Sequence, residues 1–269
     1  MNYLNYYKMK KLNLSIIALL FLSIFSHAQT TADEILKNYF ENIGGVEKLS
    51  NLKSLKMTAS LNQGGMEIPV TIYRTKDGKQ ALEISFQGMS FKQGVFDGET
   101  LWGTNQMTMK PEKMDKEATE NMKLEINDFP DPFLNYKEKG YTVELIGKED
   151  FQGTETFKIK LVTEPITVDG KKEDSVSYYF FDTENFVPIA MQTEIKSGQA
   201  KGMMSETLFS DYQEVDGLYF PYSLTMGGVK GQPGAPIKIT KIEVNSKIDD
   251  AMFAFPKEEV AKPAAATKE

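Results

Sequence analysis

The chain has 269 residues, with 31 Lys and Arg against 38 Asp and Glu, and a formal net charge of −7. An acidic chain is a poor partner for nucleic acid or for an anionic membrane surface. It contains no cysteine and one histidine, His27, which excludes disulfides, thiol redox chemistry and zinc sites built from His and Cys.

Residues 1–28 have the pattern of a secretory signal peptide. Three lysines in residues 8–11 precede the apolar run Leu12–Phe25, and Ser26-His27-Ala28 supplies small residues for cleavage. A membrane anchor is the alternative, but the run is shorter than the ~20 residues that span a bilayer. We expect an exported, periplasmic protein cleaved near Ala28. Its mature chain would keep 28 basic and 38 acidic residues, a net charge of −10, and would lack the His of a Ser-His-Asp triad.

Two helices are predicted at the start of the mature chain. Residues 31–43 place Ile35, Leu36, Tyr39, Phe40 and Ile43 at helical spacing, which makes one apolar stripe. Gly44-Gly45 is suited to end this helix in a left-handed turn. A shorter helical segment, Val46–Leu52, leads into the first strand.

Residues 55–102 predict consecutive strands, because their apolar residues fall on alternate positions. We expect these residues to share one apolar face of an antiparallel sheet, with polar residues on the other face. Asp77-Gly78 and Asp97-Gly98 predict type I′ turns between strands. The apolar face consists of Leu55, Met57, Ala59, Leu61, Ile68, Val70, Ile72, Leu82, Ile84, Phe86, Met89, Phe91 and Val95, with Arg74 on the same side and Trp102 beside the last turn.

The rest of the chain predicts one helix and a return to strands. Lys110–Leu124 has a charged, helix-forming composition, and the strand pattern resumes at Tyr141 and runs to Asn245, with turns at Asp169-Gly170 and Asp216-Gly217. A sheet this large, apolar on one face, is expected to curl. We predict a mainly β fold with few helices: a curled antiparallel sheet, an unclosed half-barrel, whose concave face is covered by helices. It would form one domain, residues 29–256, followed by a disordered tail, residues 257–269.

Several motifs resemble the LolA family of periplasmic lipoprotein carriers. Val95–Trp102 (VFDGETLW) is similar to that family's DGKTLW hairpin. Asp211–Pro221 resembles the late hairpin of the superfamily, and Ile242–Phe253 resembles its closing strand and tail. The similarity covers most of residues 31–256.

The resemblance implies a half-barrel carrier or chaperone that binds a lipid or lipoprotein acyl chain in an apolar cavity. The cavity would be lined by the apolar face described above together with Trp102. In the family a strand arginine gates the cavity by bonding to a lid helix, and Arg74, the only arginine here, stands at the matching place. An arginine whose head group reaches water near Asp77 is the alternative. The resemblance also implies a monomer, no cofactor, and an envelope transporter or outer-membrane receptor as a further partner.

The chain departs from the family in two ways, and several alternatives stay open. The proline that follows the family's arginine is Thr75 here, and the chain is acidic where the family uses a basic surface. Trp102 and the many methionines also suit a packed core. The acids Asp169, Glu173, Asp174, Asp182 and Glu184 match neither a glycosidase pair nor a calcium loop, so no catalysis is expected. The alternative function is a non-catalytic cell-envelope module that docks a partner protein.

Overall fold

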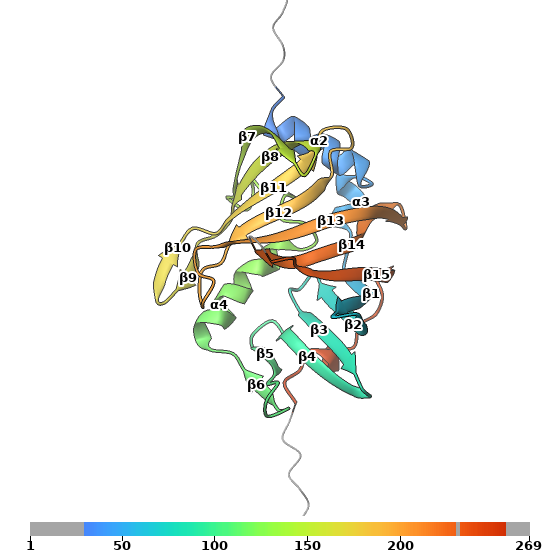
Figure 1. Ribbon diagram of the computed structural model, residues 1–269, viewed down its shortest axis with the longest axis vertical. Coiled ribbons are helices and arrows are strands. Elements are labelled where there is room, and N and C mark those ends of the chain that lie inside the picture. The colour runs from blue at the N-terminus through green and yellow to red at the C-terminus, as the bar shows by residue number, and fades with distance from the viewer. Residues whose placement is uncertain (1–29, 230–231, 257–269) are drawn as a thin grey trace, which may run out of the picture. The chain divides into compact units, whose positions relative to one another are not determined.

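The alternating pattern that begins after residue 53 becomes a large antiparallel sheet (Figure 1). The computed structural model describes residues 30–229 and 232–256. The predicted signal peptide and the predicted tail, residues 257–269, lie outside the described residues. The described residues from Ala32 onward belong to one compact unit, and this unit contains every element considered below.

Helix α2 (Ala32–Asn42) and helix α3 (Val46–Ser50) match the two predicted helices to within a few residues. The apolar stripe of α2 is buried through Ile35, Leu36, Tyr39 and Phe40. The turn between the helices requires glycine at Gly44, which has a φ of 110°. A Cβ atom at this position would lie 2.1 Å from the carbonyl oxygen of Gly217.

Thirteen strands form the main sheet, in the order β6-β5-β4-β3-β2-β1-β15-β14-β13-β12-β11-β8-β7, and β9 pairs only with β10. Among the described residues, β6 and β7 are the two edges, so the sheet does not close into a barrel. This confirms the predicted fold class. The strands are β1 (Ser54–Gln63), β2 (Met66–Thr75), β3 (Gln80–Phe86), β4 (Met89–Phe96), β5 (Leu101–Thr104), β6 (Pro111–Lys113), β7 (Thr142–Phe151), β8 (Thr154–Val162), β9 (Ile166–Val168), β10 (Lys171–Glu173), β11 (Val176–Asp182), β12 (Pro188–Glu194), β13 (Met204–Val215), β14 (Leu218–Val229) and β15 (Ala235–Val244).

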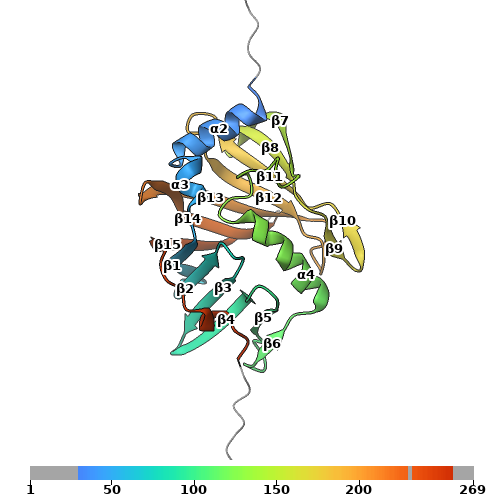
Figure 2. The same ribbon diagram turned by 180° about the vertical axis from the view of Figure 1, so that it is seen from behind.

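Helix α4 (Lys116–Leu124) crosses the concave side of the sheet, as Figure 2 shows from behind. The predicted helix started earlier, at Lys110, but residues 111–113 pair with β5 as strand β6. The helix begins after Asp115, whose carboxylate accepts a hydrogen bond from the amide of Ala118 at 2.7 Å. A 3₁₀ turn, η1 (Glu125–Asp128), follows α4, and another, η2 (Asp250–Met252), lies near the C-terminus. Among the helices described, none is long and apolar enough to cross a membrane.

The Asp-Gly turns are of two kinds. Both residues have positive φ at Asp169-Gly170 and at Asp216-Gly217, whereas at Asp77-Gly78 and Asp97-Gly98 only the glycine does. The predicted type I′ geometry is therefore wrong at Asp77-Gly78 and at Asp97-Gly98. At Asp97 the carboxylate instead accepts hydrogen bonds from the amides of Glu99 and Thr100, at 2.9 and 2.7 Å. An aspartate side chain that bonds to its own turn replaces the need for a second positive φ.

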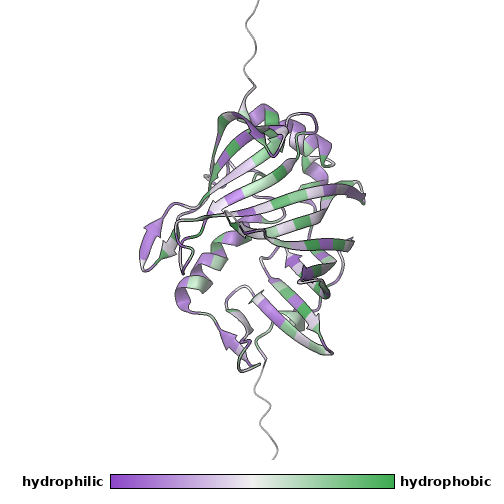
Figure 3. Ribbon diagram, in the orientation of Figure 1, coloured by the Kyte–Doolittle hydropathy of each residue, from purple (hydrophilic) through white to green (hydrophobic). Residues whose placement is uncertain are grey.

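The sheet buries apolar residues on both of its faces. Green and purple bands alternate along most strands in Figure 3, as expected for strands with one apolar side. The larger cluster joins α2, α3 and the segment around Phe133 to the concave face. A smaller, separate cluster contains Tyr73, Ala81, Val95, Trp102 and Phe253. The second cluster was not predicted, and it changes the position of two candidate site residues.

Candidate functional site

The strand register brings most of the predicted apolar face together. Met57 lies opposite Ile72, which lies opposite Leu82 on the next strand. In the same way Ala59 lies opposite Val70, and Val70 opposite Ile84. Directly opposite residues in antiparallel strands place their side chains on the same face. Leu55, Leu61, Ile68, Phe86, Met89 and Phe91 complete the set through the pairs Leu55–Arg74, Leu61–Ile68, Ile84–Phe91 and Phe86–Met89.

An apolar pocket of about 290 Å³ lies at the end of this face where β1–β4 reach their turns. Five of its lining residues were predicted from the alternation alone: Leu61, Ile68, Ile84, Phe86 and Phe91. The remaining lining residues are Gln63, Met66, Gln93, Gln106 and Met109. Pockets that bind small molecules are mostly apolar with a few polar groups and start near this size.

The other end of the face is closed by the protein itself. Leu55, Ala59 and Val70 are each 3% exposed and belong to the larger core cluster, which includes the apolar stripe of α2. By contrast, Ile84, Phe86 and Phe91 keep part of their surface exposed. The concave face is therefore filled at one end and hollow at the other.

Val95 and Trp102 do not line this pocket. They lie opposite each other on β4 and β5 and pack with Phe253 in the smaller cluster. The indole nitrogen of Trp102 donates a hydrogen bond to the carbonyl oxygen of Phe253 at 2.9 Å. The prediction that Val95 shares a face with Phe91 is therefore wrong.

A β-bulge causes this change of face. The register of β3 and β4 shifts between the pairs Leu82–Gln93 and Gln80–Phe96, and Gly94 has a φ of 55°. An extra residue in one strand reverses the direction of every side chain beyond it. The sequence carries a signal for this, because Gly94 precedes two adjacent apolar residues, Val95 and Phe96, and both are fully buried.

Arg74 faces the concavity beneath the segment that follows α4. Its guanidinium lies over the ring of Phe129, 5.7 Å from the centroid, and the negative charges of Glu125, Asp128 and Asp131 oppose the effect of burial, which lowers the pKa of the arginine. Within the described residues burial and the charges of these acids act on the guanidinium, and no hydrogen bond does. The guanidinium of Arg74 is thus held by the cation–π contact with Phe129 and by the negative charges of the nearby acids, and not by the turn at Asp77.

The segment after α4 is fixed to the filled end of the sheet by Asp131. This carboxylate accepts hydrogen bonds from the hydroxyl of Tyr39 at 2.6 Å and from the amide of Phe133 at 2.8 Å. Burial raises the pKa of Asp131, although these hydrogen bonds lower it. Lys139 reinforces the segment by donating to the carbonyl oxygens of Asn127 and Pro132, both at 2.9 Å. The segment is therefore anchored through α2 on one side.

Helix α4 itself is held by polar contacts and has no buried residue. Asn121 exchanges two hydrogen bonds with the main chain of Thr167, at 2.7 and 2.8 Å. The carboxylate of Glu117 accepts from the amides of Asp169 and Gly170, at 3.0 and 2.8 Å. We call these four hydrogen bonds between α4 and the β9–β10 hairpin the clasp. A helix held this way can separate from the sheet without exposing a packed core.

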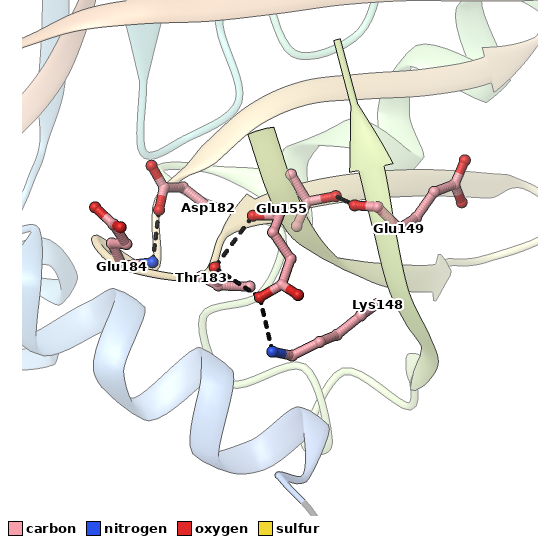
Figure 4. Close-up of polar contacts among 7 residues, drawn as sticks. Lys148, Glu149, Glu155, Asp182, Thr183 and Glu184 are labelled. Carbon is pink, nitrogen blue, oxygen red and sulfur yellow. Dashed lines mark hydrogen bonds and ion pairs between the residues drawn. The ribbon is translucent and has the colours of Figure 1, made fainter. Parts of the chain in front are cut away.

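The acidic residues considered for catalysis lie in turns or loops or at the ends of strands. Figure 4 shows the turn at Asp182, whose carboxylate accepts from the amide of Glu184 at 2.6 Å. In the same view the carboxylate of Glu155 accepts from the ammonium of Lys148 at 2.8 Å. Asp169 and Glu173 face lysines at 3.5 and 3.6 Å. In the part of the chain that the structure describes, no group of three or more Asp, Glu, His or Cys could hold a metal.

A larger hollow of about 620 Å³ lies along β12–β14 and is a weaker candidate. Its lining mixes Gln152, Gln192 and Glu206 with aliphatic residues. Gln192 donates a hydrogen bond to Glu206 at 2.9 Å, so two of its polar groups already satisfy each other. The smaller pocket instead contains five residues of the predicted apolar face and no charged residue in its lining.

A family model described as "Uncharacterized protein" matches residues 100–256, which is more than half of the chain. The search of curated proteins found no match to the sequence. Among solved structures, a LolA superfamily protein from Nitrosomonas europaea has 12% identity and a TM-score of 0.50, and the match covers 84% of this chain and 98% of that one. A DUF1329 family protein from Desulfovibrio piger has 13% identity and a TM-score of 0.49, with 82% and 97% covered. The first of these structures has the same fold as this chain.

Proposed function

Since the chain belongs to the family whose model, described as "Uncharacterized protein", matches residues 100–256, and has the fold of a LolA superfamily protein, we propose that it carries a lipid or lipoprotein acyl chain. The acyl chain would occupy the hollow end of the concave face. No covalent chemistry is needed for this role. The proposed place of action is the periplasm, reached through the predicted signal peptide.

The apolar pocket at the ends of β1–β4 is the observation that supports this proposal best. Its walls include Ile68, Ile84 and Phe91, and the last two stay partly exposed. Burying an acyl chain contributes roughly 0.8 kcal/mol per CH₂ group. A guest would therefore bury apolar surface that the protein leaves open.

Loss of cargo from a pocket variant tests the proposal. Ile84→Asp places a charge in the pocket lining, whereas Ile146→Asp makes the same change at a side chain that is 49% exposed on edge strand β7. Native mass spectrometry of protein secreted by a diderm bacterium should find lipid on the wild type and on Ile146→Asp. Ile84→Asp should carry at least tenfold less, because a buried charge is strongly disfavoured.

The same measurement separates the second candidate function. A non-catalytic module that docks a partner protein would carry no lipid in any of the three forms. Equal lipid on Ile84→Asp and on the wild type, with both folded by circular dichroism, would remove the pocket from the proposal. Envelope partners such as a transporter or an outer-membrane receptor remain compatible with either function.

Arg74 is proposed to act as a gate by holding the segment after α4 against the concave face. Arg74→Leu removes the cation over Phe129, so we expect lipid release to become severalfold faster with little loss of fold. Lys76→Leu is the matched control, because Lys76 is exposed and its ammonium donates a hydrogen bond to the carbonyl oxygen of Ser50, away from Phe129. Transfer of a fluorescent fatty acid to acceptor vesicles measures the rate. Identical rates for Arg74→Leu and the wild type would contradict the gate.

A further inference from the structure

Three turns surround the mouth of the apolar pocket and share an unusual composition. Residues 62–67 contain the turn between β1 and β2 with the adjoining strand ends, residues 85–90 contain the turn between β3 and β4 with its strand ends, and residues 105–110 join β5 to β6. Each contains a glutamine and at least one methionine, and Glu67 and Lys110 are the only charged residues among them. The whole chain is 26% charged. We call these three turns the neutral rim.

The methionines of the neutral rim point into solvent. Met107 is 91% exposed, Met66 55%, Met89 49% and Met109 45%. Large apolar side chains that gather in one exposed place mark an interaction site. Because Met66 and Met109 also line the pocket, the exposed apolar surface continues into the hollow.

We propose that the neutral rim docks the protein on a lipid bilayer of uncharged or zwitterionic headgroups, so that an acyl chain passes between bilayer and pocket without crossing water. This inference rests on the proposed carrier function. It names the surface at which cargo is exchanged.

The charge of the rim and of the chain selects this partner. Few charges have to leave water when the rim enters the headgroup layer, and flexible thioether side chains adapt to disordered acyl chains. The formal net charge of −7 opposes approach to an anionic bilayer. A specific protein interface usually has aromatic anchors at its centre, whereas the large apolar side chains that the rim exposes are methionines.

A vesicle assay with a matched pair of variants tests the docking surface. The rim variant is Met107→Asp with Gln87→Asp, two exposed residues that do not line the pocket. The control variant is Met203→Asp with Gln152→Asp. Gln152-Gly153 forms the same turn as Gln87-Gly88, with φ values of 53° and 89° against 51° and 79°, and Met203 is also exposed.

The mature chain and both variants are sedimented with sucrose-loaded phosphatidylcholine vesicles. The wild type and the control variant should bind equally, and the rim variant should partition about tenfold or more weakly, since one buried methionine accounts for roughly that factor. Replacing part of the phosphatidylcholine by phosphatidylglycerol should weaken binding of the wild type. Absence of binding by the wild type, equal binding by the rim variant, or an equal loss in the control variant would each overturn the proposal.

Cargo loading separates this inference from the carrier function. Each protein is titrated in solution, without vesicles, with a fluorescent fatty acid below its aggregation concentration. The rim variant should load like the wild type, because its pocket is intact. Failure of the wild type to load would contradict the carrier function. Normal loading of the rim variant together with unchanged vesicle binding would contradict only the proposed docking surface.

Discussion

The two ends of the concave face have the same sequence pattern and opposite packing. On β8 and β11, Ile159 and Phe181 are both fully buried. On β3 and β4, Ile84 and Phe91 alternate in the same way but stay partly exposed. The difference therefore does not come from the strands.

The covering elements explain the difference. Helix α2 places an apolar stripe on the first end, where Tyr39 and Phe133 make edge-on ring contacts with Phe181 at 5.4 and 5.6 Å. At the second end the pocket is lined by residues of the strands and their turns, and no residue of α4 is among them. Rings packed this closely stabilise a fold, whereas an end without such a cover leaves room for a guest. One sheet thus combines a rigid core with a capacity to bind.

Removing one aromatic ring from each end should give the largest difference in the free energy of unfolding between the two ends. Phe181→Ala is expected to lower the free energy of unfolding by about 3–5 kcal/mol, because a buried ring leaves a cavity. Phe91→Ala should lower it by only about 1–2 kcal/mol, since its site is already hollow. Denaturant unfolding of both variants measures the difference. Equal losses would mean that the two ends are packed alike.

Weakening the clasp should lower the local stability of α4 and leave the stability of the sheet nearly unchanged. Asn121→Ala removes both hydrogen bonds to Thr167, which we expect to cost about 1–3 kcal/mol of local stability. Amide exchange in α4 should become faster by tenfold or more, while exchange in β8 and the global unfolding midpoint stay nearly unchanged. Faster exchange throughout the sheet would instead show that α4 is part of the core.

A smaller effect is expected from the carboxylate that anchors the segment after α4. Burial raises the pKa of Asp131, so the folded state binds this proton more tightly than the unfolded state does. Its contribution to stability is present at low pH and is lost as pH rises through the raised pKa. Each tenfold difference in proton affinity between the two states is worth about 1.4 kcal/mol. Acidification from pH 7 toward pH 4 should therefore stabilise the wild type relative to Asp131→Asn, as measured by denaturant unfolding at each pH.

Asp33 provides a control of opposite sign. Hydrogen bonds from Lys137 and Tyr136 lower the pKa of this carboxylate, so its contribution is present above the ordinary pKa and is lost on acidification. Relative to Asp33→Asn, the wild type should lose stability over the acidic end of the same range. A wild type that tracks Asp131→Asn at every pH would contradict the role of burial at Asp131.

The local parts of the fold followed from the sequence. Alternation placed β1, β2 and β3 and assigned Leu61, Ile68, Ile84, Phe86 and Phe91 to one face, and helical spacing located α2. These features depend on residues within about ten positions of one another, which is the range that a periodic pattern describes.

The features that the sequence did not predict depend on single residues or distant contacts. The bulge at Gly94 moved Val95 and Trp102 to the other face, and nothing in the alternation before it indicates where their partner Phe253 lies. The clasp joins Asn121 to Thr167 through main-chain groups, which carry no side-chain pattern. At Asp97 the turn depends on two hydrogen bonds that the aspartate side chain accepts, and the Asp-Gly dipeptide alone does not specify them.

The pairing of β1 with β15 sets the order in which this protein is able to fold. Leu55 lies opposite Val244, so the two halves of the sheet join only after nearly the whole chain has been made. Closing so long a loop is slow, and the early strands remain without their neighbour until then. If the chain is exported as proposed above, it would reach a secretion channel before its tertiary structure forms, while it is still able to pass through in an unfolded state.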